Sequence, residues 1–279
     1  MKACMIVPLF TLALSPLVAS ASPGALEINQ DCIAVGCFAG DTPGYPVTIT
    51  QPGSYVFTSD VATPPNTTQP VIDVEASPVD IDLNYHTIDG GGSCTGTPVT
   101  SCTGFSGGRG LAFSNNGNPG VFHVHDGTVR GFGGSGISMF DSGDGTLLER
   151  LTVTQNQYGA GIITTSDLTT TRIRDSQFVR NLQVGLFVSN GQNRLLIENC
   201  SVVGNSADGI QVGTGSVVVG NRISSNGGLG LHAYGASATC AMGQNVFSGN
   251  NGGGGAVQYQ IQTVRDMGGN VCLEKATCP

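Results

Sequence analysis

The chain has 279 residues, of which only 11% are charged, and its formal net charge is −8 at pH 7. Its first third is the most acidic part, because residues 22–108 hold nine acidic side chains and no lysine or arginine. Nucleic-acid backbones and anionic membrane surfaces attract basic protein surfaces. We therefore expect neither a nucleic acid nor a membrane surface among the partners of this protein.

The N-terminus has the three parts of a secretory signal peptide. A lysine follows Met1, an apolar run covers residues 5–18, and Ala19-Ser20-Ala21 forms a small-residue cleavage site. We expect residues 1–21 to be removed and the protein to be secreted, periplasmic or attached to the cell surface. No other segment is long and apolar enough to span a bilayer.

The following segments lead into the folded part of the chain. Residues 22–46 contain Cys32 and Cys37 and are predicted to cap the open end of the fold. Period-two alternation of apolar residues predicts four strands, at 47–50, 54–58, 71–75 and 79–83. Residues 91–108 are rich in Gly, Ser and Thr, and we expect them to form a loop that leaves the scaffold and can carry binding residues.

A repeat dominates the second half of the chain. A glycine followed by an aliphatic residue returns seven times at steps of 21 to 26 residues, at Gly110, Gly136, Gly161, Gly185, Gly209, Gly230 and Gly255. Five asparagines keep the same spacing, at Asn156, Asn181, Asn205, Asn226 and Asn250. Such a period indicates one short unit stacked on copies of itself. Because asparagine tolerates left-handed backbone, we expect each one to mark a tight bend.

Apolar residues around these anchors alternate with period two and form three inward stacks. The first contains Leu111, Ile137, Ile162, Leu186, Ile210, Leu231 and Ala256. The second contains Val129, Val153, Phe178, Val202, Ile223 and Phe247, and the third contains Leu148, Ile173, Ile197, Val218 and Met242. The stacks predict an all-β, single-domain parallel β-helix at residues 47–260, with three-stranded coils of about 24 residues. Residues 261–279 are then expected to form a C-terminal cap.

Two sequence segments carry a family resemblance. Residues 221–231 (Asn-Arg-Ile-Ser-Ser-Asn-Gly-Gly-Leu-Gly-Leu) resemble the coils of right-handed parallel β-helix repeat proteins of the pectin-lyase-like superfamily. Residues 79–90 (Val-Asp-Ile-Asp-Leu-Asn-Tyr-His-Thr-Ile-Asp-Gly) are similar to the first full coil of its bacterial members. The resemblance implies a right-handed helix over residues 45–275. It does not imply an activity, because the polygalacturonase, pectate lyase and alginate lyase sequence motifs are missing.

Export would leave eight of the nine cysteines in a compartment where disulfides form. The short spacings predict the pairs Cys32 with Cys37 and Cys94 with Cys102. Cys200 and Cys240 stand almost two coils apart, about 9 Å at the interstrand spacing, which exceeds the reach of a disulfide. We therefore expect Cys200 to be a buried thiol and Cys240 to pair with Cys272 or Cys278.

One outward strip is the predicted glycan-binding surface. It would contain Ser138, Ile163, Phe187, Gln211 and His232, one from each of five successive coils. An exposed apolar pair, Ile163 and Phe187, between hydrogen-bonding side chains suits the faces and hydroxyls of sugars. The alternative is an ordinary sheet surface with some apolar side chains.

Acidic turns suggest a second candidate site. Asp141, Asp144 and Asp167 fall on neighbouring turns and would offer oxygen ligands to calcium. Asp141 and Asp167 also meet the spacing of paired carboxylates in glycoside hydrolysis, although nothing marks them as acid and base. Aspartate is also a common turn residue, so the alternative is a structural role. We expect no cofactor beyond this calcium.

Two further patterns of polar residues favour a structural role. Glu149, Arg174 and Glu198 take one outward position in successive coils and predict a salt-bridged ladder with the arginine between two carboxylates. His123 and His125 share a strand face, but the sequence shows no third ligand beside them.

The favoured function is therefore an exported, non-catalytic β-helix that binds a polysaccharide or cell-envelope glycan, or that acts as a cell-surface structural module. The alternative is a polysaccharide lyase or glycoside hydrolase with Asp141 and Asp167 at its centre. Neither the glycan nor the oligomeric state follows from the sequence.

Overall fold

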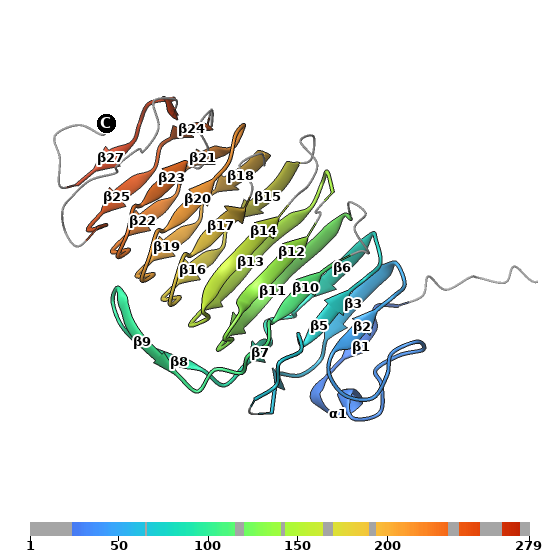
Figure 1. The fold of residues 1–279 in the computed structure, drawn as a ribbon. Coiled ribbons are helices and arrows are strands. Elements are labelled where there is room, and N and C mark those ends of the chain that lie inside the picture. The colour runs from blue at the N-terminus through green and yellow to red at the C-terminus, as the bar shows by residue number, and fades with distance from the viewer. Residues whose placement is uncertain are drawn as a thin grey trace, which may run out of the picture.

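A computed structural model gives the arrangement of the chain. It describes residues 24–64, 66–114, 120–140, 143–163, 170–189, 194–233, 240–251 and 264–273. These form an elongated solenoid of parallel strands stacked along one axis (Figure 1). The predicted signal peptide lies outside the described residues, and no helix within them is long and apolar enough to cross a bilayer. The all-β fold is as expected.

The described strands fall into two large parallel sheets and one hairpin. The eight-stranded sheet contains β2 (Val47–Ile49), β5 (Ile72–Val74), β10 (Leu111–Phe113), β12 (Ser135–Phe140), β14 (Tyr158–Ile163), β17 (Leu186–Ser189), β20 (Ile210–Val212) and β23 (Leu231–Ala233). From β14 to β25, each repeat adds one strand to this sheet and two to the 17-stranded sheet.

The 17-stranded sheet covers two sides of the solenoid, because β11 and β13 continue through the corner between them. Its N-terminal strands are β1 (Leu26–Ile28), β3 (Gly53–Phe57), β4 (Val61–Ala62), β6 (Val79–Asp82), β7 (Thr87–Asp89), β11 (Phe122–Arg130) and β13 (Leu147–Thr154). The next are β15 (Thr170–Arg174), β16 (Gln177–Val179), β18 (Arg194–Glu198), β19 (Ser201–Val203), β21 (Val217–Val219) and β22 (Arg222–Ser224). The last are β24 (Cys240–Gly243), β25 (Val246–Ser248), β26 (Val264–Asp266) and β27 (Val271–Cys272).

Two of the three predicted stacks are confirmed in strand register. Val129, Val153, Phe178, Val202, Ile223 and Phe247 pair in that order. Leu148, Ile173, Ile197, Val218 and Met242 do the same. All of these side chains are buried. The inward faces thus give one continuous hydrophobic core, which is the main driving force for stacking the coils.

The first predicted stack is wrong at one coil. Ile137 pairs with Ala160 and not with Ile162, which pairs instead with Met139 and Val188. The repeat glycine of this coil is therefore Gly159. In four other coils a Cβ on this glycine would lie 2.7–2.9 Å from the amide nitrogen of the neighbouring asparagine, at Gly136, Gly185, Gly209 and Gly230, and at Gly159 the same amide is 3.1 Å away. A side chain would collide with that amide, so glycine is retained there.

The asparagines themselves do more than mark bends. Asn156, Asn181, Asn205 and Asn226 are fully buried, and each backbone N–H donates to the side-chain oxygen of the asparagine one coil further on. The residue before each of these four, and before Asn250, carries the left-handed backbone, namely Gln155, Arg180, Gly204, Ser225 and Gly249. The prediction of an asparagine in the left-handed region is thus wrong by one residue. Its amide lies inside the corner because the buried backbone groups there need partners.

A second, shorter ladder occupies the other corner of the 17-stranded sheet. Asn221 donates from its backbone to Asn245, and Asn245 donates in the same way to Asn270. Cys200 takes the preceding position, and its N–H donates to the Asn221 side chain at 2.8 Å. Its thiol is buried and unbonded to another sulfur, as predicted, and burial raises its pKa to about 12.

The disulfides agree with the sequence in two of three cases. Cys32 is bonded to Cys37 and Cys94 to Cys102. Cys240 is a free buried thiol, so its predicted pairing with Cys272 or Cys278 is wrong. The register explains this, because Cys240 pairs with Val264 while Cys272 lies opposite Phe247 on a different side of the solenoid. Cys272 is disulfide-bonded, and its partner is none of the described cysteines.

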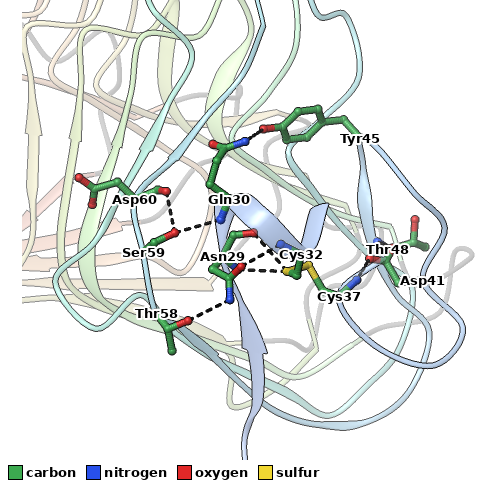
Figure 2. Close-up of a disulfide and its surroundings, with 10 residues drawn as sticks. All are labelled: Asn29, Gln30, Cys32, Cys37, Asp41, Tyr45, Thr48, Thr58, Ser59 and Asp60. Atoms are coloured by element: carbon green, nitrogen blue, oxygen red, sulfur yellow. Dashed lines mark hydrogen bonds between the residues drawn. A yellow bond between two sulfur atoms is a disulfide. The ribbon is translucent and has the colours of Figure 1, made fainter. Parts of the chain in front are cut away.

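The N-terminal segment is fastened to the first strands (Figure 2). β1 pairs with β3, and the short helix α1 (Gln30–Ile33) follows. Asn29 caps this helix and donates through its side chain to Thr58, while Gln30 donates to Tyr45. Strand pairing also continues beyond residue 260, where β26 and β27 extend the 17-stranded sheet.

The predicted excursion at residues 91–108 contains a β-hairpin. Its strands β8 (Ser93–Gly96) and β9 (Val99–Thr103) are cross-linked by Cys94 and Cys102. The hairpin runs along the side of the solenoid (Figure 1). Val99 donates to the carbonyl of Gly204, and Arg180 donates to that of Cys94. The hairpin thus covers a corner several coils beyond its own position in the sequence.

Replacing Asn205 by alanine tests the asparagine ladder. The change leaves the buried N–H of Asn181 without its acceptor and the carbonyl of Phe178 without its donor. We expect the free energy of unfolding in urea to fall by about 2–4 kcal/mol. Gln177→Ala, at an exposed position of β16, is the control and should stay within ~0.5 kcal/mol. Equal effects of the two substitutions would contradict a stabilising ladder.

Alkylation tests the two free thiols. Burial raises the pKa of Cys240 to about 11 and that of Cys200 to about 12, so neither should react with iodoacetamide in the folded protein at pH 8, since the thiolate is the reactive species. After unfolding in guanidinium without reductant, peptide mapping should find both alkylated and Cys32 and Cys37 unmodified. Alkylation of Cys240 that requires a reductant would mean that it forms a disulfide.

Candidate functional site

Polar side chains gather on the outer face of the 17-stranded sheet where β6 lies beside β11. Asp80 pairs in register with His123, and Asp82 pairs with His125. The alternate residues of both strands, such as Ile81 and Val124, are buried in the core. The alternation of a strand therefore sends the two aspartates and the two histidines to the same outer surface.

His123 lies between two carboxylates. Its Nδ1 is 2.7 Å from Oδ1 of Asp80, and its Nε2 is 3.2 Å from Oε1 of Glu149 on β13. The imidazole is about one-third exposed, while the Glu149 side chain is 5% exposed. The histidine therefore links a solvent-accessible aspartate to a buried glutamate.

His125 is held in the same way by a different carboxylate. Its Nδ1 lies 2.6 Å from Oδ2 of Asp126, and its Nε2 lies 3.5 Å from Oδ1 of Asp80. The two imidazole rings stack, with centroids 4.3 Å apart. Both rings thus present one nitrogen to Asp80 and the other to a carboxylate behind them.

Two arginines keep these rear carboxylates charged. Arg150 donates to both oxygens of Asp126, at 2.6 and 2.8 Å, and these bonds together with that from His125 lower the pKa of Asp126 to about 2. Burial opposes ionisation of Glu149, but hydrogen bonds from Arg150, Arg174 and His123 outweigh it and its pKa lies below the ordinary value. Glu149 and Asp126 are therefore hydrogen-bond acceptors at neutral pH.

The predicted Glu149–Arg174–Glu198 ladder is present in register, but only one of its two ion pairs, Arg174 with Glu149, is formed. Arg174 is flanked by Glu149 and Glu198 on adjacent strands. It bonds Glu149, while Glu198 bonds Arg172 two residues earlier on β15. The buried Glu149 also contacts His123, so the ladder and the histidine pair, which the sequence presents as two separate patterns, belong to one cluster.

The side chains of this face form one long register row. Ser54, Asp80, His123, Leu147, Arg172 and Leu196 follow one another across β3, β6, β11, β13, β15 and β18. At the usual strand spacing the row is about 24 Å long. A cavity of about 270 Å³ opens around Ser54, Asp80 and His123, and another of about 320 Å³ opens around Leu147, Arg172 and Leu196.

The predicted strip on the eight-stranded sheet is not formed as expected. Gly161, and not Ile163, lies between Ser138 and Phe187 in register, because the repeat glycine of that coil is Gly159. Ser138 is buried, and the Phe187 ring packs over Gly161 and against Tyr158.

Gln211 and His232, the remaining two members of that strip, do pair in register. Both bond to Oδ2 of Asp208, at 2.9 and 2.8 Å respectively, and Leu229 donates its N–H to Oδ1 at 2.7 Å. These side chains fasten a turn to the sheet, which accounts for their polarity.

Two of the three aspartates proposed for calcium, Asp141 and Asp167, lie outside the described residues. Asp144 is exposed, and its Oδ1 accepts a hydrogen bond from the backbone of Thr170 at 3.2 Å. It also borders the cavity at Leu147 and Arg172.

Asp73 is a perturbed carboxyl group on the other sheet, between Thr48 and Ala112 in register. Burial raises its pKa, and repulsion by Glu75 adds to this, while a hydrogen bond from Ser114 acts in the opposite direction. Its position on the eight-stranded sheet separates it from the histidine cluster.

A family comparison agrees with this architecture. Residues 105–264, more than half of the chain, match the model of the right-handed beta helix region. The chain belongs to this family. No curated protein matches the sequence of this right-handed β-helix.

Two solved structures of viral proteins are similar to this chain. One is the enzymatically active domain of tailspike protein 2 of bacteriophage CBA120, with a TM-score of 0.50 and 15% identity over 85% of this chain and 43% of that one. Another is ORF18 of Geobacillus virus E2, with a TM-score of 0.49 and 14% identity over 81% of this chain and 50% of that one. This right-handed β-helix thus spans half or less of each of these chains, and the likeness concerns the fold alone.

Sequence reasoning missed the site because it treated its parts one at a time. The signal was the outward alternation Asp80-x-Asp82 and His123-x-His125 on two strands. These strands are adjacent in space although the disulfide-linked hairpin and β10 lie between them in the chain. Register across such an insertion does not follow from the repeat spacing.

Replacing Asp73 by asparagine tests the cost of burying its charge. Because the pKa is raised in the folded state, ionisation weakens folding as the pH rises from the unfolded pKa, near 3.9, through the folded pKa. We expect Asp73→Asn to be more stable than the wild type at pH 7 and similar to it at pH 3, as measured by urea midpoints. Asp144→Asn controls for loss of one exposed carboxylate. A lower stability of Asp73→Asn at pH 7 would contradict the assignment.

Proposed function

We propose that this protein is an exported, non-catalytic β-helix that binds an extended glycan along the outer row from Ser54 to Leu196. The observation that carries the proposal is that two cavities open along one register row of the same sheet. Two cavities that follow one another along the solenoid axis suit a linear polymer. This row replaces the strip on the eight-stranded sheet, where Ile163 does not lie opposite Phe187 in register.

The chemistry of the row fits a carbohydrate. Apolar surface is provided at one end by Pro78 and Val121 and at the other by Leu147 and Leu196. Between and beside these patches stand the polar side chains of His123, Asp80, Asp144 and Arg172. Binding sites for small ligands and sugars combine apolar contact area with a few polar groups in this manner.

Export is supported by the cysteine chemistry. The described part of the chain contains two closed disulfides, Cys32–Cys37 and Cys94–Cys102, and both belong to short surface segments. Disulfides of this kind persist in oxidising compartments. Together with the signal-like N-terminus they favour a secreted, periplasmic or cell-surface location.

Cleavage of the bound polymer is the second candidate function. The observation that favours it is the position of His123 between an accessible and a buried carboxylate, at the cavity around Ser54 and Asp80. Such a group can transfer a proton when a substrate replaces one of its partners. This alternative uses Asp80, His123 and Glu149 and not the acidic turns of the sequence hypothesis.

Co-sedimentation with insoluble or cross-linked polysaccharides, neutral and uronate-containing, tests glycan binding. We expect one polymer to retain the protein, and Leu196→Ser to weaken binding about tenfold, or ~1.4 kcal/mol, by removing apolar contact. Val246→Ser, at a 37% exposed outward position of β25, is the matched control and should bind as the wild type does.

The soluble fraction of the same incubation distinguishes the two functions. Oligosaccharides that mass spectrometry detects with the wild type and not with His123→Ala would establish cleavage and overturn the non-catalytic proposal. Retention by no polymer would instead leave a structural role at the cell surface.

A further inference from the structure

We propose that Asp80, His123 and His125 form a binding site for a single divalent transition-metal ion, with zinc as the best match. Each of the three residues offers one ligand atom, and these atoms all lie within 4.8 Å of one another. Two imidazole nitrogens and one carboxylate oxygen are a common ligand set for zinc. The inference is independent of glycan binding.

The hydrogen bonds behind the histidines fix which nitrogen faces Asp80 as an acceptor. Asp126 accepts from Nδ1 of His125 at 2.6 Å, which leaves the lone pair of Nε2 directed toward Asp80. Glu149 accepts a hydrogen bond from Nε2 of His123 at 3.2 Å, which leaves the lone pair of Nδ1 directed toward Asp80. A carboxylate behind each metal-binding histidine is the usual arrangement that sets its tautomer and orientation.

These bonds bring three acceptors together at one point. The Asp80 oxygen lies 2.7 Å from Nδ1 of His123 and 3.5 Å from Nε2 of His125. Three lone pairs directed at each other repel unless a proton or a metal cation lies between them. Ligands of tetrahedral zinc are about 3.3 Å apart, so the pair to His125 fits and the pair to His123 needs to open by ~0.6 Å.

The rear carboxylates are not ligands themselves, because arginines occupy them. Arg150 bonds both oxygens of Asp126, and Arg150 and Arg174 bond different oxygens of Glu149. For this reason the neighbouring group of Asp82, His125 and Asp126 is a poorer site, although its atoms are also close together. The arginines thus hold the supporting carboxylates in place and leave Asp80 as the single anionic ligand.

The site is open on one side. Asp80 and His123 are 39% and 34% exposed and border the cavity at Ser54 and Pro78. A fourth ligand, water or a ligand oxygen, can therefore reach the ion from this cavity. An open fourth position distinguishes such a site from a closed structural zinc site.

Zinc binding to the protein without a polyhistidine tag tests the proposal. After dialysis against chelator, we expect isothermal titration calorimetry with zinc chloride to give one zinc per chain. Elemental analysis of protein that has then been dialysed against zinc chloride should give the same ratio. Zinc should also raise the thermal midpoint, because a ligand that binds the folded state stabilises it. Cobalt(II) as a second probe should give the visible absorption of a tetrahedral site.

Three variants locate the ion. His123→Ala and Asp80→Asn change partly exposed side chains and should each lower zinc affinity at least about tenfold and abolish the cobalt spectrum. His86→Ala is the matched control, because His86 is also paired with an aspartate, Asp60, at 3.2 Å, and it should bind zinc as the wild type does.

The contrary results are equally definite. If the wild type binds no zinc, a proton on His123 satisfies Asp80 and the proposal is overturned. An equal loss of affinity in His86→Ala would also overturn it, since the ion would then lie elsewhere. Polysaccharide retention measured in chelator separates this result from the failure of glycan binding.

Discussion

The asparagine ladder at the inner corner is the interaction on which the rest of the solenoid depends. From Asn156 onward each coil turns sharply there, and the turn leaves buried N–H and carbonyl groups that strand pairing does not satisfy. The side-chain oxygen of each asparagine accepts a hydrogen bond from the backbone N–H of the asparagine in the preceding coil. Its side-chain NH₂ donates to a backbone carbonyl of that preceding coil, so Asn181, Asn205 and Asn226 join successive coils. A buried polar group without such a partner would lower the free energy of unfolding, because no hydrogen bond would replace those it makes with water.

The ladder also sets the register of the opposite strands. Because each amide fills the space beside the repeat glycine, the residue after that glycine is fixed as inward-facing. Gly159 obeys this rule and Gly161 does not, and the outward row on β12, β14 and β17 changes accordingly. Surface chemistry on this fold is thus decided by a packing constraint inside it, since a shift of strand register moves side chains along or across the sheet.

On the 17-stranded sheet the same fixed register gathers charge. Asp80, His123 and Glu149 stand on three adjacent strands, and Arg150 and Arg174 close the cluster from the far side. Buried carboxylates are tolerated only with such partners. The arrangement leaves one side of the cluster accessible, where two cavities follow the sheet. Rigid strands therefore hold a polar site that mobile loops would position less well.

The sequence alone determined the class of fold and most of the core. Its period, its glycines and its alternating apolar residues sufficed for the two stacks headed by Val129 and Leu148, because repetition over many coils averages out local ambiguity. The two local disulfides followed from short spacing. The buried state of Cys200 followed from its place in the repeat.

Tertiary structure decided what the sequence left open. The coil at Gly159 contains two glycines, Gly159 and Gly161, that could occupy the repeat position. Only the contact with the neighbouring asparagine amide distinguishes between them. Cys240 and Cys272 lie on different sides of the solenoid and are therefore not paired with each other, which their spacing in the sequence does not reveal. The aspartates of β6 meet the histidines of β11 across an inserted hairpin. Each of these outcomes depends on which strands become neighbours, and that is set by the stacking of whole coils rather than by local sequence.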